Sequence, residues 1–208
     1  ISSMSGSGTG DMMDAILAAL PAETKADEED DLPRITIVGR PNVGKSSLTN
    51  RLLGKERSIV ADMAGTTRDA IDSDFRRNGE LYRIIDTAGM RRRGKIAETT
   101  ERYSVARALH AVDRSDVVLM VLDARDGVTE QDQRIAGYAH EAGKGLVVVV
   151  NKWDLLKKND RTMTEFAEKL KENLAFMTYA PTVYVSALTG QRVSRIMDYV
   201  DVAAAEQV

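Results

Sequence analysis

The sequence predicts an α/β fold in which a six-stranded, mostly parallel sheet with one antiparallel strand has helices on both faces. Strand and helix signals alternate from Arg34 onward, which is typical of parallel α/β sheets. Residues 117–122 and 146–150 are continuous apolar runs and indicate strands buried on both faces. Asn78-Gly79 between two strand-like segments is a strong hairpin signal, so the antiparallel strand is expected there.

Each element of this fold follows from a local pattern. The β-branched run at residues 35–38 predicts the first strand, and Leu48 and Leu52, one helical turn apart, predict a helix that Gly54 ends. The other strands are expected at residues 71–77, 81–85, 117–122, 146–150 and 182–185. The other helices, marked by apolar residues at helical spacing, are expected at residues 99–112, 131–142, 163–176 and 191–205. Ligands of such sheets bind beyond the carboxyl ends of the strands.

Length and composition exclude several classes of protein. A chain of 208 residues with 43 % hydrophobic and 29 % charged residues is typical of a globular protein with one large domain. No apolar run approaches the roughly 18 residues of a membrane-spanning helix. The absence of cysteine excludes disulfides, thiolate metal sites and cysteine nucleophiles, and two histidines leave little for a histidine-built metal site. We expect a cytoplasmic monomer with neither membrane nor DNA as a partner.

The chain divides into three segments. Residues 1–6 and 12–16 resemble residues 185–190 and 196–200 at one common offset, which indicates two copies of a strand-end, loop and helix unit; chance recurrence of serine-glycine loops is the alternative. We interpret residues 1–16 as the C-terminal remnant of an upstream domain cut away from this chain. Residues 17–33 are an acidic linker without apolar periodicity, and residues 34–208 are one full domain.

Residues 39–46 predict a phosphate-binding loop. They are Gly-Arg-Pro-Asn-Val-Gly-Lys-Ser, the GxxxxGK[ST] pattern, between the first predicted strand and helix. Glycines let backbone N–H groups curl around a phosphate at a helix N-terminus. Lys45 would reach the β- and γ-phosphates, and the Ser46 hydroxyl would ligate Mg²⁺. The alternative is a glycine-rich turn that binds nothing.

Two aspartates at strand ends complete the predicted site. Asp154, in Asn151-Lys152-Trp153-Asp154, can accept hydrogen bonds from N1–H and N2–H₂ of guanine, which adenine does not offer in that arrangement. We interpret Trp153 as a packing residue. Asp86 follows a predicted strand beside the phosphate loop, where a carboxylate would neutralise magnesium. A polar strand end and a solvated turn aspartate are the respective alternatives.

These motifs resemble the GTPases of the translation-factor-related P-loop class, and within it the second G domain of the EngA (Der) family of bacterial double GTPases. The resemblance covers about residues 34–208. It is carried further by residues 65–69 and 86–89, similar to the two switch motifs, by the guanine-supporting loop at residues 186–188, and by residues 91–96, 103–105, 129–132 and 151–155. It implies a P-loop NTPase G domain here and, in residues 1–16, the end of the family's first G domain.

The resemblance also implies roles for single residues. Thr67 would ligate Mg²⁺ when the triphosphate is bound, Asp86 would hold the metal through water, and Gly89 would donate its N–H to the γ-phosphate. Lys152 would flank the guanine plane, and the Ala187 N–H would help to hold O6. The expected nucleotide contacts are Gly39, Arg40, Pro41, Asn42, Val43, Gly44, Lys45, Ser46, Ser47, Asp86, Gly89, Asn151, Lys152, Asp154, Ser186, Ala187 and Leu188.

The implied activity is hydrolysis of GTP to GDP and phosphate, as a switch in the biogenesis of the large ribosomal subunit. The expected partners are guanine nucleotide and, through the full-length protein, the large subunit or its RNA. The expected catalytic residues are Asn42, Lys45, Thr67 and Gly89. Met90 stands where many small GTPases have a water-orienting glutamine. The resemblance implies that potassium held by Asn42 supplies the missing charge, unless Asn42 only stabilises the loop.

Two other functions remain open at this stage. Met90 is compatible with a nucleotide-gated binding module that has negligible hydrolysis on its own. An ATP-using P-loop enzyme is opposed by Asp154. Arg91, Arg92 and Arg93 follow the second switch motif. They would contact nucleotide, an upstream domain or ribosomal RNA or, alternatively, form a solvated basic loop.

Overall fold

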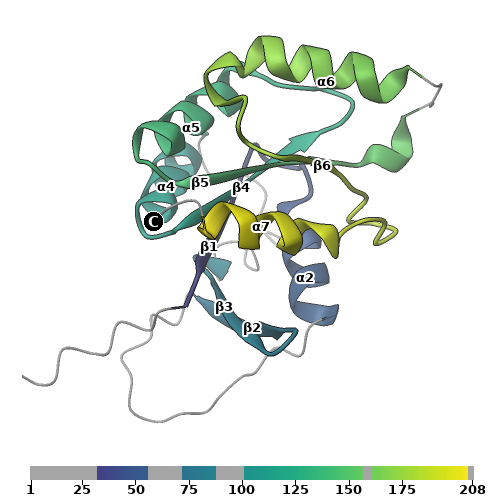
Figure 1. Ribbon diagram of the computed structural model, residues 1–208. Coiled ribbons are helices and arrows are strands. Elements are labelled where there is room, and N and C mark those ends of the chain that lie inside the picture. The colour runs from purple at the N-terminus through teal and green to yellow at the C-terminus, as the bar shows by residue number, and fades with distance from the viewer. Residues whose placement is uncertain (1–31, 56–71, 88–100, 157–160, 206–208) are drawn as a thin grey trace, which may run out of the picture. The chain divides into compact units, whose positions relative to one another are not determined.

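The computed structural model describes residues 32–55, 72–87, 101–156 and 161–205 (Figure 1), within a compact unit that begins at Leu32. Its strands are β1 (Arg34–Val38), β2 (Ser73–Arg77), β3 (Glu80–Ile84), β4 (Val117–Asp123), β5 (Gly145–Asn151) and β6 (Thr182–Tyr184). Its helices are α2 (Lys45–Lys55), α4 (Glu101–Asp113), α5 (Glu130–Glu141), α6 (Thr162–Asn173) and α7 (Arg195–Ala205), with short 3-10 helices η1 (Trp153–Leu155) and η2 (Ala175–Met177).

The strands form one six-stranded sheet in the order β2-β3-β1-β4-β5-β6. The β2–β3 pair is antiparallel and every other pair is parallel, so the predicted fold class is confirmed. β1 lies between β3 and β4, with Ile35 opposite both Ile84 and Val117. The chain therefore leaves β1 toward one side of the sheet and later crosses to the other. The phosphate loop follows β1 at this switch point, where open α/β sheets bind ligands.

Helices cover both faces of the sheet, as predicted (Figure 1). Alternate residues of β4 belong to different hydrophobic clusters because successive side chains of a strand point to opposite faces. Leu119 packs in the cluster that contains α2 and α7 residues, and Met120 packs in the cluster of α5 and α6 residues. Burial on both faces explains why β4 and β5 are continuous apolar runs.

The predicted hairpin is confirmed, and three predicted helix boundaries are wrong. Asn78 and Gly79 both have positive φ, 51° and 97°, as a two-residue hairpin turn requires. Gly54 lies inside α2 and does not end it. The helix expected at residues 163–176 ends at Asn173, and a separate 3-10 helix follows it at Ala175–Met177. The helix expected from residue 191 begins at Arg195, because the preceding residues close a turn in which the Ser186 N–H donates to the Gln191 carbonyl oxygen at 3.1 Å.

Candidate functional site

The loop between β1 and α2 bends through backbone conformations that favour glycine. Gly39 has a φ of 138° and Gly44 a φ of 99°. A Cβ atom on Gly39 would lie 2.3 Å from the Val121 carbonyl oxygen, and one on Gly44 would lie 2.3 Å from Asn151 Nδ2. Both distances are shorter than the closest approach of two non-bonded heavy atoms. Glycine at these two positions therefore lets the loop pass close to β4 and β5.

Lys45, the first residue of α2, has its ammonium group against this loop. Its Nζ donates to the Gly39 carbonyl oxygen at 2.6 Å and to the Arg40 carbonyl oxygen at 2.5 Å. Ser46 follows in the first turn of α2 and is half-buried. The positive charge is thus held where the backbone N–H groups of a GxxxxGK[ST] loop surround an anion.

Arg40 fixes the phosphate loop to the start of α5. Its Nε lies 3.1 Å from Asp132 Oδ2, and its Nη2 lies 3.3 Å from Asp126 Oδ2. The fully buried Asp132 also accepts hydrogen bonds at Oδ2 from the N–H and the hydroxyl of Thr129 at 3.0 and 2.7 Å. This capping arrangement makes the loop and the N-terminus of α5 one connected unit.

Asn151, the last residue of β5, connects the phosphate loop to the loop after β6. Its Nδ2 donates to the Val43 carbonyl oxygen at 2.8 Å, and its Oδ1 accepts the Ala187 N–H at 2.9 Å. All three residues are buried. A buried amide that satisfies one donor and one acceptor on separate loops fixes their spacing.

Lys152 has left-handed backbone conformation, with a φ of 61°, and its side chain returns to the phosphate loop. Its Nζ donates to the Asn42 carbonyl oxygen at 2.6 Å and to Asp123 Oδ2 at 2.7 Å. Burial by itself would raise the pKa of the Asp123 carboxyl. The hydrogen bonds from Arg125 and Lys152 outweigh burial and hold that pKa well below its usual range.

Trp153 and Asp154 have different environments although they are neighbours in η1. Trp153 is buried and packs edge-on against Phe166, with ring centroids 5.5 Å apart, and against Tyr184 at 4.4 Å, which confirms its packing role. Asp154 is half-buried. Its Oδ1 atom is buried, and no hydrogen-bond partner for it exists among the residues that the structure describes.

The loop after β6 is a closed turn. Besides the Ser186–Gln191 hydrogen bond, the Gly190 N–H donates to the Ser186 carbonyl oxygen at 2.8 Å and the Thr189 N–H donates to Ser186 Oγ at 3.1 Å. Ser186 and Ala187 are buried, whereas the Leu188 side chain is 77 % exposed. The turn thus presents a large apolar side chain to solvent at the carboxyl edge of the sheet.

The three loops at residues 39–46, 151–154 and 186–190 form one candidate site at the carboxyl ends of β1, β5 and β6, joined by Asn151. Comparison with known proteins identifies the family of the chain. Residues 34–152, more than half of the chain, match the family described as 50S ribosome-binding GTPase. The chain belongs to that GTPase family.

One curated relative of this chain is GTPase Der of Desulfitobacterium hafniense (strain DSM 10664 / DCB-2). The two are 59 % identical over 204 residues, which are 98 % of this chain and 46 % of the relative. The resemblance to the EngA (Der) family is therefore confirmed, and the chain spans about half the length of the curated relatives it matches.

Solved structures of GTPases have the same fold. A single-residue variant of Aquifex aeolicus Era bound to GDP and AlF4⁻ is 27 % identical, with a TM-score of 0.60 over 81 % of this chain and 56 % of that one. Era in complex with MgGDPNP and nucleotides 1506–1542 of 16S ribosomal RNA is 26 % identical, also with a TM-score of 0.60, over 81 % of this chain and 55 % of that one.

In this member of the GTPase family, Asp86 forms an ion pair with an arginine. Arg107 of α4 donates from Nε to Asp86 Oδ2 at 2.6 Å and from Nη2 to Oδ1 at 2.5 Å, and this hydrogen bonding raises the pKa of Arg107. Asp86 has a φ of 61°, and its N–H donates to Asp72 at 2.8 Å. The predicted magnesium ligand is therefore engaged by a cation of the protein itself.

Some predicted site residues lie outside the described residues: Thr67, Gly89, Met90 and the three arginines that follow it. The sequence patterns did not predict Asp123, Arg107 or Arg51 as site residues. Asp123 ends the apolar run of β4 at the same sheet edge, so the rule that located Asp86 would have found it. Arg107 and Arg51 are basic residues within helices and carry no local signal.

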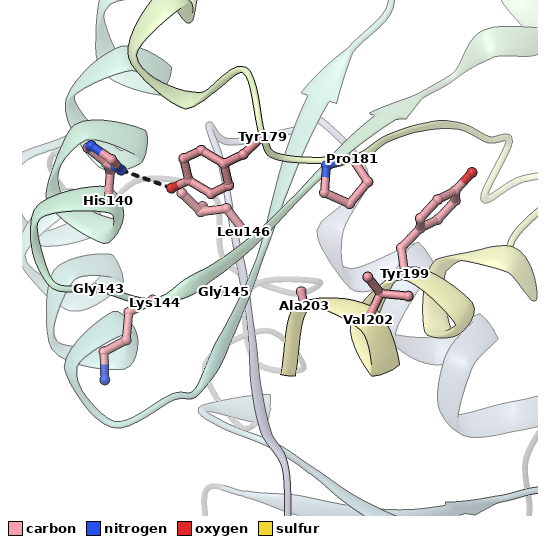
Figure 2. A pocket seen from close by; sticks show the side chains of 10 residues that line it. All are labelled: His140, Gly143, Lys144, Gly145, Leu146, Tyr179, Pro181, Tyr199, Val202 and Ala203. Carbon is pink, nitrogen blue, oxygen red and sulfur yellow. Dashed lines mark hydrogen bonds between the residues drawn. The ribbon is translucent and has the colours of Figure 1, made fainter. Parts of the chain in front are cut away.

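A cavity of about 630 Å³ lies at the opposite edge of the sheet (Figure 2). It is lined partly by Gly145, the first residue of β5, by Ala203 of α7, and by His140 and Tyr179, whose Nδ1 and hydroxyl oxygen are 2.9 Å apart. None of the motif residues lines it. The candidate site is thus defined by the loops at the carboxyl edge.

Two features are absent from the described ranges. No helix there has the length and apolar character needed to cross a bilayer. No group of three or more His, Cys, Asp or Glu side chains there could by itself hold a metal ion.

Proposed function

We propose that this chain binds guanine nucleotides and hydrolyses GTP to GDP and phosphate, as a nucleotide switch in the biogenesis of the large ribosomal subunit. The observation that carries the guanine assignment is Asp154, because its buried Oδ1 has no partner in the described part of the chain. A buried acceptor without a hydrogen bond costs about 1–3 kcal/mol. The N1–H and N2–H₂ groups of guanine would satisfy it.

The carboxylates of Asp132 and Asp154 differ in the hydrogen bonds that they accept. Its Oδ1 is also buried without a partner among the described residues, but its Oδ2 accepts three hydrogen bonds, from Arg40 and Thr129. For Asp154 no hydrogen bond to either oxygen is found within those ranges. An unsatisfied aspartate at the carboxyl edge of the sheet fits a ligand that supplies two parallel donors.

The phosphates would bind to the loop at residues 39–46. Its backbone N–H groups and the N-terminus of α2 favour an anion. Lys45 would then exchange the carbonyl oxygens of Gly39 and Arg40 for the β- and γ-phosphate oxygens. This exchange is electrostatically favourable because a charged acceptor replaces two neutral ones.

Magnesium fits the donors at this site. The Ser46 hydroxyl, the Asp86 carboxylate and the Thr67 hydroxyl are hard oxygen ligands, which Mg²⁺ prefers together with phosphate oxygens and water. When bound, Mg²⁺ neutralises charge on the β- and γ-phosphates. Asp86 would have to leave Arg107, while Thr67 and Gly89 would follow the presence or loss of the γ-phosphate and so provide the switch.

Met90 stands where many small GTPases have a water-orienting glutamine. A potassium ion at Asn42 is proposed to supply the missing positive charge. Asn42 is exposed and has a φ of 63°. Lys152 holds its carbonyl oxygen, while its side-chain amide makes no hydrogen bond within the described residues. An amide oxygen is a suitable ligand for such a cation. The alternative is that Asn42 only stabilises the turn.

We also propose that the chain is organised in three segments. Residues 1–16 would be the end of an upstream G domain, residues 17–33 the linker, and residues 34–208 a G domain that acts as a cytoplasmic monomer without a membrane or DNA partner. The family description supports the large subunit as the partner. The Era structure with 16S ribosomal RNA supports ribosomal RNA as a ligand class for such proteins.

Phosphate release tests the proposed activity. We expect turnover of GTP and none of ATP in the presence of Mg²⁺, and faster turnover in potassium than in sodium. An Asn42→Ala variant should lose the difference between the two salts. If GTP is bound but not turned over in either salt, the alternative of a nucleotide-gated binding module, which Met90 favours, replaces the enzyme.

A further inference from the structure

Arg51 connects the helix after the phosphate loop to the guanine-supporting loop. It lies on α2, and its half-buried side chain donates from Nε to the Ala187 carbonyl oxygen at 3.0 Å. Its Nη2 donates to the Leu188 carbonyl oxygen. In Figure 1 the loop that leads into α7 lies beside α2. One planar guanidinium thus holds two successive carbonyl groups of a loop 136 residues away in sequence.

Gly190 leaves the space that the guanidinium fills. A Cβ atom on Gly190 would lie 3.0 Å from Arg51 Nη1, and Gly190 has a φ of 84°. The turn is therefore shaped closely around the arginine. Asn151 holds the same loop from the other direction through the Ala187 N–H, so two side chains together fix the peptide on either side of Ala187.

The hydrogen bonds of Arg51 determine where the next N–H group points. The C=O and N–H of a trans peptide point in opposite directions. Because the Ala187 C=O points toward Arg51, the Leu188 N–H points away from it. No hydrogen bond to this N–H is found among the described residues. The Ala187 N–H, which the resemblance assigned to O6, donates to Asn151 Oδ1 instead. A carbonyl that accepts a charged donor also makes the N–H of its own peptide a stronger donor.

We propose that Arg51 is a positioning residue for base recognition, which holds the loop so that the Leu188 N–H donates to the O6 atom of guanine. This inference rests on the proposed guanine site. Asp154 would select the N1–H and N2–H₂ groups, and the loop that Arg51 holds would select O6. Arg51 itself does not touch the base.

The test compares GDP with 6-thio-GDP, in which sulfur, a weaker acceptor, replaces O6. Affinities are measured by calorimetry with Mg²⁺ for the full chain and its variants. We expect Arg51→Ala to weaken the binding of GDP about tenfold and that of 6-thio-GDP at most about twofold, so that the preference for GDP falls at least about fivefold. Arg51→Lys should retain part of the preference because an ammonium can still donate to both carbonyls.

Arg195→Ala is the matched control, since it removes the same charge from an exposed position at the start of α7 and should change neither affinity. Equal weakening of both nucleotides by Arg51→Ala, or no weakening, would overturn the role of Arg51 in O6 recognition. If Arg51→Ala does not fold by circular dichroism, Arg51→Lys must keep more of the GDP preference than Arg51→Gln, or the inference is rejected. A wild-type chain that binds ADP as tightly as GDP would reject the proposed function itself.

Discussion

The two ends of the candidate site differ in how their charged groups are satisfied. At the phosphate end, Lys45 binds carbonyl oxygens of its own loop and Asp86 is paired with Arg107. At the base end, Asp154 Oδ1 is buried and has no partner in the described residues, and Leu188 is 77 % exposed. A ligand must displace existing contacts at the phosphate end, whereas it only adds contacts at the base end. The phosphate end is therefore expected to rearrange, and the base end to be preformed.

Replacing Asn151, which links the two ends of the site, should have the largest effect on the free energy of unfolding. Asn151→Ala removes both hydrogen bonds of a buried side chain and leaves the Val43 carbonyl and the Ala187 N–H without their partner. We expect a loss of about 2–4 kcal/mol in the free energy of unfolding, measured by urea denaturation. Asn173→Ala, which removes a hydrogen bond from an exposed asparagine to Lys169, should cost much less. Equal costs would mean that the two loops are not held by Asn151.

At the phosphate end, Lys45→Met should weaken GDP about 100-fold. Two hydrogen bonds from an ammonium to phosphate oxygens contribute about 1.5–3 kcal/mol each, reduced by the carbonyl contacts that Lys45 gives up. Calorimetry measures the affinity, and thermal unfolding without nucleotide controls for folding. A loss for GDP no larger than that caused by Lys144→Met, at a lysine beside the cavity at the other sheet edge, would contradict the phosphate assignment.

The sequence was sufficient to predict the fold class and the motifs, because local sequence patterns indicate both. Apolar runs located β4 and β5, and Asn78-Gly79 located the hairpin. Gly54 was misassigned because its helix continues past it. The start of α7 was misassigned because a turn closed by the Ser186–Gln191 backbone hydrogen bond comes before it.

Contacts between the motifs could not be predicted in the same way. The pairing of Arg51 with Ala187 and that of Arg107 with Asp86 join residues 136 and 21 positions apart. Such partners depend on which helices the topology brings to the carboxyl edge. Asp123 is the exception, since it ends a strand that the sequence predicts at that edge.

A smaller effect is expected when Arg107 is replaced, because this arginine would compete with magnesium for the Asp86 carboxylate. Arg107→Ala should lower the Mg²⁺ concentration required for half-maximal binding of a GTP analogue about three- to tenfold, because the exposed pair is worth only about 1 kcal/mol. Arg134→Ala, which removes a charge from an exposed position of α5, is the control. A higher magnesium requirement in Arg107→Ala would show that Arg107 supports the metal site instead of opposing it.

The central claim is that Asp154 recognises guanine, and exchange of its carboxylate for an amide tests this most directly. The amide nitrogen of Asp154→Asn can donate to the C2 oxygen of xanthine, but it cannot accept a hydrogen bond from the N2 amine of guanine. Titration calorimetry with GDP and xanthosine diphosphate should therefore show a wild-type preference for GDP of about 100-fold and a reversed preference in Asp154→Asn. A variant that still prefers GDP by the wild-type factor would contradict the account.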